Sequence, residues 1–322
     1  MAVRGALYFQ IRQSQGASEK FHGAVIDHYG ENDTRVFREV CQVGETLKAI
    51  SELAGSEVKS QVAMIYDWDS RWAMEDSKGP RNDGLHHQEM LLKYYRAFRK
   101  QGMNVDLIDM DCSIEGYQVL VLPMTYMFKQ GFAEKVRAFV EQGGVLITTY
   151  WSGIADDTDR CYLGGTPHGL MDVLGLRSTE IDGLFDWEEN QFMPVDGNEL
   201  GLFREYTCKY LCDLVRLDGA QALMTYGSDF YQGYPALTVN RYGKGSAWYV
   251  AADAEQVFQE DFIAKLLEHE EICGAVPGEI PEGLEVTTRE TEDVRYYIYQ
   301  NFGTGRVTLP LPEVRPRRYS VI

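Results

Sequence analysis

Glu19 and His22 lie three positions apart in a polar loop near the start of the chain. The loop follows an apolar segment, Ala6 to Ile11, whose pattern predicts a buried strand. A strand that runs into a loop carrying a carboxylate and an imidazole is typical of the last strand and active-site loop of a β/α barrel. Such a barrel needs about 250 residues, so we expect the rest of it to lie upstream.

A second group of chemically useful side chains follows the apolar stretch Val62 to Tyr66. The residues are Asp67, Trp68, Asp69 and Trp72. Carboxylates at the carboxyl edge of a parallel sheet can bind a ligand or a cation. The tryptophans suit a sugar or a protein interface. We favour an interdomain loop whose tryptophans pack against another domain.

Independent catalysis on this sheet has little support in the sequence. Thr149-Tyr150-Trp151-Ser152-Gly153 is too bulky for a nucleophile elbow, and no cysteine is flanked by glycines two positions away. Gly243 and Gly245 precede a predicted strand, whereas a dinucleotide site needs a helix there, so they predict a hairpin turn. We therefore predict no catalytic residue and no cofactor.

The elements that position these residues begin with a predicted helix over 33–54, capped by Asn32 or Asp33 and ended by Gly55. Its apolar residues recur at spacings of four and three, as in a heptad seam. The seam consists of Val36, Val40, Val43, Leu47, Ile50 and Ala54. We expect it to pack across the next domain or a neighbouring subunit.

An α/β pattern follows. Predicted strands at 62–66, 105–109, 119–123 and 145–150 are separated by predicted helices at 86–101 and 132–142. Strands joined through single helices imply right-handed crossovers and a parallel sheet. The expected fold class is α/β, a flavodoxin-like or class I glutamine amidotransferase-like doubly wound parallel sheet.

The remaining segments predict further strands and one more helix. A short helix is expected at 169–174, short strands and turns over 177–230, a hairpin at 235–242 and 246–251, and a helix at 258–268. After a linker at 277–283, strands at 284–289, 294–300, 307–311 and 319–322 predict a small antiparallel β domain. The expected domains are 1–30, a TIM-barrel remnant; 31–60, a linker helix; 61–276, the α/β domain; and 277–322, the β domain.

Charge and composition exclude some partners. The net charge of −18 argues against nucleic acid and against anionic membrane surfaces. No apolar run approaches the roughly 20 residues that span a bilayer. Arg4, Gln10 and Arg12 interrupt the N-terminal apolar stretch, so it does not resemble a signal peptide. This favours the cytoplasm. The six scattered cysteines include no CxxC pair, and we predict reduced thiols and no metal site.

Five segments together resemble the C-terminal part of glycoside hydrolase family 42, the trimeric β-galactosidases. They are Ala6 to Gly23, Tyr66-Asp-Trp-Asp-Ser-Arg-Trp-Ala-Met-Glu75, Val119 to Met124 with Gly143 to Ile147, and Asn240-Arg-Tyr-Gly-Lys-Gly245. The chain departs from the family at Ile11, where tryptophan is usual, and in its abbreviated C-terminal domain. The resemblance implies the end of the catalytic barrel, a trimerisation domain and a shortened β domain.

The resemblance also implies roles. Phe9, Glu19 and His22 would help to hold galactose, while the family's two catalytic glutamates have no counterpart here. Retaining glycosidases need two carboxylates about 5–5.5 Å apart, and Glu19 alone cannot supply both. We therefore expect a non-catalytic assembly portion, inactive alone, that forms a homotrimer. Galactoside would bind only where a barrel is supplied, by the parent protein or by a separate chain.

An alternative function remains open from the residues. A stand-alone α/β protein that binds a carbohydrate or another small ligand would use Asp67, Trp68, Asp69 and Trp72 at the sheet edge. Without a barrel, the segment 1–30 has unpaired strand edges. Unless a partner supplies the barrel, we expect it to be disordered or to pack non-natively, and there Glu19 and His22 are as readily solvated loop residues as site residues.

Overall fold

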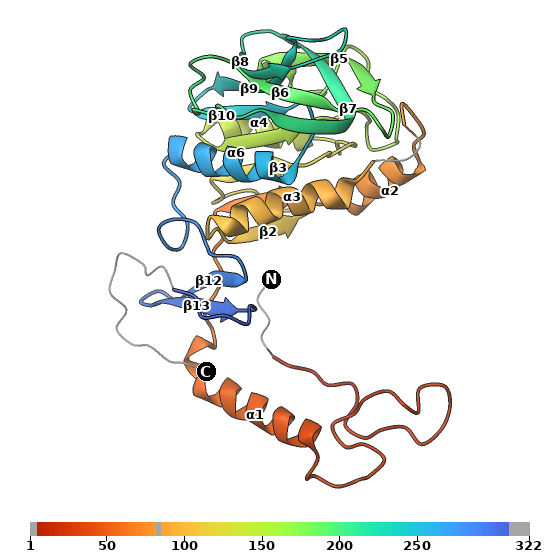
Figure 1. Ribbon diagram of the computed structural model, residues 1–322, viewed down its shortest axis with the longest axis vertical. Coiled ribbons are helices and arrows are strands. Elements are labelled where there is room, and N and C mark those ends of the chain that lie inside the picture. Colours follow the sequence, from red (N-terminus) through yellow and green to blue (C-terminus); the bar gives the residue numbers. More distant parts are fainter. Residues whose placement is uncertain (1–4, 82–84, 309–322) are drawn as a thin grey trace. The chain divides into compact units, whose positions relative to one another are not determined.

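The computed structural model describes residues 5–81 and 85–308. They divide into two compact units (Figure 1). Unit 1 contains residues 5–59 and 288–298, and unit 2 contains residues 60–81, 85–287 and 299–308. No helix of the described residues is both long enough and apolar enough to cross a membrane.

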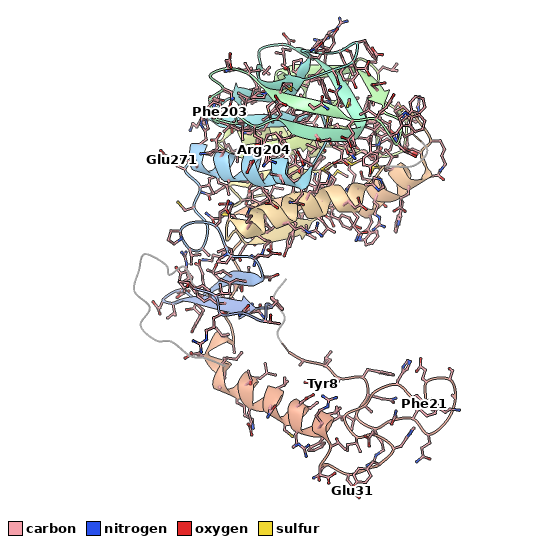
Figure 2. All side chains as sticks on the ribbon, in the orientation of Figure 1. Tyr8, Phe21, Glu31, Phe203, Arg204 and Glu271 are labelled. Atoms are coloured by element: carbon pink, nitrogen blue, oxygen red, sulfur yellow. The ribbon has the colours of Figure 1, made fainter. Side chains whose placement is uncertain are left out.

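Unit 1 begins with irregular chain. Residues 5–34 form no helix or strand, only an isolated bridge between Arg12 and Ile26. Figure 2 shows Tyr8, Phe21 and Glu31 along these loops. The prediction of a buried strand at Ala6–Ile11 is therefore wrong. A barrel strand is held by hydrogen bonds to strands on both sides, and here Leu7, Phe9 and Ile11 are exposed instead.

Helix α1 (Arg35–Ala49) confirms the predicted helix, followed by the short 3₁₀ helix η1 (Ser51–Leu53). Its cap differs from the prediction of Asn32 or Asp33. Thr34 is the N-cap, because its hydroxyl accepts a hydrogen bond from the Phe37 N–H at 3.2 Å. No residue of α1 is buried, and its seam residues Val36, Val43 and Leu47 are exposed. The helix thus presents an uncovered apolar stripe.

Unit 2 contains most of the regular structure. Its elements are β1 (Val62–Ile65), α2 (Trp68–Asp76), α3 (His87–Lys100), β2 (Val105–Ile108), β3 (Val119–Leu122), α4 (Phe132–Glu141), β4 (Val145–Thr149), α5 (Met171–Leu174), β5 (Leu176–Gly183), β6 (Asn190–Pro194), β7 (Tyr206–Leu217), β8 (Gln221–Tyr226), β9 (Pro235–Tyr242), β10 (Gly245–Val250), β11 (Ala252–Ala254) and α6 (Gln256–His269). Helices α3 and α6 pack side by side (Figure 1). Strands β12 (Leu284–Glu290) and β13 (Arg295–Asn301) form a separate two-stranded sheet.

The large sheet confirms an α/β fold but is mixed rather than parallel throughout. Its order is β11-β7-β6-β8-β9-β10-β4-β3-β1-β2, with β5 paired to β7. Strands β2, β1, β3, β4 and β10 pair in parallel, and the remaining pairs are antiparallel. The change occurs at β10, because a tight turn joins it to β9 and such a turn permits only an antiparallel pair.

Two further predictions need correction. The segment after β1 is helix α2 and not a loop, because the Asp67 side chain accepts a hydrogen bond from the Ser70 N–H and so starts the helix. In the tail, β12 and β13 match predicted strands, whereas residues 307 and 308 lie outside any strand. The predicted strand at 319–322 and the end of that at 307–311 lie outside the described residues.

Gly245 at the start of β10 gives a test of this hairpin. A Cβ added there would lie 2.2 Å from the Gly144 carbonyl oxygen and 2.4 Å from that of Val140. We expect Gly245→Ala to lower the free energy of unfolding by about 2 kcal/mol, because backbone must move to admit the methyl group. Denaturant unfolding measures this. Gly305→Ala, with no neighbour within 4 Å, should change stability little, and equal effects would contradict the packing described.

Candidate functional site

The carboxyl ends of three neighbouring parallel strands bring charged side chains together. Asp67 follows β1, Asp111 follows β2, and Lys129 follows β3. Lys129 Nζ lies 2.8 Å from Asp67 Oδ2 and 3.1 Å from a carboxylate oxygen of both Asp69 and Asp111. This cluster stands where the strand order changes direction between β1 and β3, the place at which open α/β sheets bind ligands.

Asp67 is buried and fully engaged. Its Oδ1 accepts a hydrogen bond from the Ser70 N–H at 3.1 Å, and its Oδ2 accepts one from the Met110 N–H at 3.5 Å. Burial by itself would lower the pKa of Lys129, but hydrogen bonds to the three carboxylates outweigh it and raise that pKa above its usual value. Asp67 therefore holds α2, the loop after β2 and Lys129 in place.

Of the predicted site residues, Asp67 and Asp69 thus both pair with the Lys129 ammonium group, Asp67 in the interior and Asp69 at the surface. No group of three acidic, histidine or cysteine side chains among the described residues is placed to hold a metal ion. Lys129 was missed by the sequence analysis. The available signal was its position a few residues past an apolar strand, at the same sheet edge as Asp67.

Trp68 and Trp72 form the outer face of α2. Both are exposed, with ring centroids 5.8 Å apart. The Arg71 guanidinium lies 5.1 Å from the Trp68 ring centroid and donates from Nε to Glu75 at 2.8 Å. The structure therefore divides the four predicted residues into two ion-paired aspartates, of which Asp67 is buried and Asp69 exposed, and two exposed tryptophans.

His87 is a second buried group at this edge. Its ring stacks on Tyr66 with centroids 5.5 Å apart. Burial, with the charge of Arg71, lowers the pKa of His87 to about 4. The imidazole is therefore neutral at physiological pH and packs as an aromatic ring.

Two strained turns at the same sheet edge have the position in which a nucleophile elbow would lie. Met124 after β3 and Trp151 after β4 have φ values of 45° and 59°. A left-handed non-glycine residue after a strand is the geometry of a nucleophile elbow. Neither residue carries a hydroxyl or thiol, and the neighbouring Ser152 is buried with its hydroxyl accepting from the Thr125 N–H at 3.1 Å. The elbows therefore lack a reactive group.

A separate cavity of about 400 Å³ lies at the other half of the sheet. It is lined by Glu89, Lys93, Glu189, Thr207, Lys209, Tyr210, Asp253 and Glu255. Lys93 pairs with Asp253, and Lys209 Nζ lies 2.6 Å from Glu189. Burial raises the pKa of Asp253 although Lys93 opposes the shift. The cavity wall is thus largely occupied by its own ion pairs.

The three residues expected to contact galactose lie in the irregular part of unit 1. Phe9, Glu19 and His22 are exposed, and the His22 N–H donates to the Glu19 carbonyl oxygen at 3.0 Å. The structure thus places Glu19 and His22 on one turn without assembling a site around them.

Comparison with known proteins gives a consistent result. Residues 60–273 match the family model described as the β-galactosidase trimerisation domain, and residues 2–50 match a β-galactosidase model. The chain is 46% identical over 295 residues to β-galactosidase BglY of Alicyclobacillus acidocaldarius, covering 92% of this chain and 43% of BglY. It is 42% identical to β-galactosidase Pbg of Clostridium perfringens, covering 95% of this chain and 45% of Pbg.

Solved structures agree. The cold-adapted β-galactosidase of Rahnella sp. R3 superposes with a TM-score of 0.86 at 47% identity, over 91% of this chain and 43% of that protein. The β-galactosidase of Bacillus circulans sp. alkalophilus gives 0.86 at 38% identity, with the same coverage. The chain therefore spans less than half the length of these relatives.

Proposed function

The chain belongs to the family 42 β-galactosidases, and we propose that its main role is to assemble that enzyme as a homotrimer. The observation that carries this proposal is the match of residues 60–273 to the trimerisation domain. We take 61–276 as this domain, 1–30 as the end of the catalytic barrel, 31–60 as a linker helix and 277–322 as a small β domain.

The finer fold is part of the same proposal. The five parallel strands are ordered β2-β1-β3-β4-β10. Numbered by their appearance along the chain, these strands have the order 2-1-3-4-5 of flavodoxin-like sheets. The antiparallel strands extend this sheet beyond β10. This supports a flavodoxin-like or amidotransferase-like core whose strained turns, at Met124 and Trp151, carry no nucleophile.

Exposed apolar side chains in the first 50 residues support the proposal that this segment packs against a catalytic barrel. Leu7, Phe9 and Ile11 are exposed, as is the seam of α1, and exposed apolar stretches of this kind indicate a missing neighbour. In the proposed enzyme the barrel covers them, whether it comes from the same polypeptide or a separate chain. Phe9, Glu19 and His22 would then help to bind the terminal β-D-galactoside.

We propose that this portion does not catalyse hydrolysis by itself. A retaining mechanism needs two carboxylates on either side of the scissile bond, about 5–5.5 Å apart. At the sheet edge, Lys129 forms ion pairs with all three clustered carboxylates. The same ion pairs weigh against the alternative of a stand-alone ligand-binding protein that uses Asp67 and Asp69. The six cysteines are all free, which supports a cytoplasmic site of action.

Two measurements on one preparation test the proposal. Light scattering at micromolar concentrations should give three times the chain mass of 36.7 kDa. Hydrolysis of a chromogenic aryl β-galactoside should not exceed the rate in buffer. A monomer at every concentration would contradict the assembly role, and turnover that Glu19→Gln abolishes would contradict the absence of catalysis.

A further inference from the structure

Unit 2 carries an unusual set of exposed aromatic side chains on three separate segments. Helix α2 presents Trp68 and Trp72, the segment after β5 presents Phe185 and Trp187, and the β8–β9 connection presents Phe230 and Tyr234. We name these six residues the aromatic rim. Their exposed fractions lie between 46% and 78%.

Arg81 joins the chain just beyond α2 to the second segment of the rim. It follows α2, and its guanidinium donates to the Leu184 carbonyl oxygen and to the Asp186 carboxylate. Those two acceptors flank Phe185. The Arg81 guanidinium also lies 5.5 Å from the centre of the Tyr210 ring. The segment after α2 and the Phe185–Trp187 segment are therefore neighbours held by a largely buried arginine.

Asn190 joins the second and third segments. It follows Trp187 by three positions, and its side-chain Nδ2 donates to the Ser228 carbonyl oxygen at 3.1 Å. The Ser228 N–H donates back to Asn190 Oδ1 at 3.1 Å. Ser228 lies two positions before Phe230. The second and third segments are thus neighbours, and Arg81 ties the chain just beyond α2 to the second one, although all three are far apart in sequence.

The size of this surface is informative. At roughly 200 Å² for a whole aromatic side chain, six that are half to three-quarters exposed contribute about 700 Å². Exposed apolar patches on monomers rarely exceed about 300–600 Å², and a stable interface covers about 800 Å² on each partner. The area therefore matches one side of a protein interface.

The arrangement of the rings favours a protein over a sugar. Phe185 and Trp187 stack on each other with centroids 4.9 Å apart and an interplanar angle of 4°. Trp68 is covered in part by Arg71. A carbohydrate platform needs free ring faces, whereas an interface anchor needs large, rigid side chains, and tryptophan, tyrosine and arginine dominate such anchors.

We propose that the aromatic rim is the surface through which unit 2 contacts a second copy of the protein. This rests on the proposed trimeric function and names the surface that carries it. All six residues fall within the segment 60–273 that matches the trimerisation domain. In a closed ring of three, each copy presents one surface to a different surface of its neighbour, and the rim is one of these two.

Tryptophan fluorescence of the full chain gives a direct readout. Of the five tryptophans, Trp151 and Trp248 are buried, and the other three belong to the rim. Covering the rim should shift the emission to shorter wavelength and reduce acrylamide quenching as concentration rises. The change should follow the increase in mass measured by light scattering.

Variants separate the rim from the rest of the surface. Trp72→Ala, and separately Trp187→Ala with Phe230→Ala, should raise the concentration for half-assembly by about tenfold or more. Phe203→Ala is the matched control, since Phe203 is 76% exposed but lies away from α2 (Figures 1 and 2). It should assemble as the parent does. Circular dichroism and the melting temperature verify that each variant is folded.

The outcomes are distinct. A trimeric parent whose folded rim variants remain equally trimeric would overturn this proposal and leave the proposed function intact. A rim that proves dispensable for assembly but required for retention on a galactan would be a carbohydrate platform, which also overturns it. A parent that stays monomeric would contradict the proposed function itself, and this proposal with it.

Discussion

Replacing Lys129 with methionine is expected to lower the free energy of unfolding by about 3–5 kcal/mol. The methionine keeps the length of the side chain but removes the charge that Asp67, Asp69 and Asp111 share. Asp67 is buried, so its carboxylate would be left without a cation in a medium of low polarity. Breaking a buried pair by removing one partner is among the most destabilising single changes.

A matched control and a rescue make this prediction specific. Lys265→Met removes a lysine whose exposed side chain pairs with Glu268 on the surface of α6, and should cost less than about 1 kcal/mol. Adding Asp67→Asn to Lys129→Met should restore part of the loss, because asparagine can still cap α2 without carrying charge. Equal losses for Lys129→Met and Lys265→Met in denaturant unfolding would show that the cluster is not structural.

Asp213→Asn is expected to stabilise the protein at pH 8 and to change little near pH 4. Asp213 lies on β7 and is fully buried, and its carboxylate accepts a hydrogen bond from the Tyr249 hydroxyl. Burial raises the pKa of Asp213 from 3.8 to about 7, although hydrogen bonds from Tyr249 and the Trp151 backbone oppose the shift. No ion pair among the described residues neutralises it.

The direction in which the stability contribution of Asp213 changes with pH follows from proton binding. Between pH 3.8 and about 7 the folded state keeps a proton on Asp213 that the unfolded state has released. The contribution of Asp213 to stability is therefore greatest below pH 3.8 and falls as pH rises to about 7. A shift of about three pKa units corresponds to a difference on the order of 4 kcal/mol. The advantage of Asp213→Asn should grow to that order by pH 8.

Thermal unfolding of parent and variant from pH 4 to pH 8 measures this difference. Asp218→Asn is the control, since Asp218 is exposed just beyond the end of β7, and removing a surface charge should change stability by less than about 1 kcal/mol. Tyr249→Phe removes the donor to the charged carboxylate and should move the transition to higher pH. A difference between parent and Asp213→Asn that stays constant over the range would mean that Asp213 is ionised throughout.

The elements of the parallel half of the sheet were predictable because their signals are local. The apolar runs behind β1, β3 and β4, and the amphipathic pattern of α3, need only a few neighbouring residues to be recognised. The predicted strand at Ala6–Ile11 had the same local signal but did not form. An apolar run becomes a strand only where another strand accepts its hydrogen bonds.

Taken alone, the sequence determined the family, the α/β class and most helices and strands, since motifs, periodicity and glycine stops are short-range properties of the chain. The tertiary structure alone decided that Lys129 lies between Asp67 and Asp111. It alone placed Asp213 in the core and joined Arg81 to the segment around Phe185. Each of these depends on strand order and on which crossover brings distant segments together, and no local pattern encodes that order.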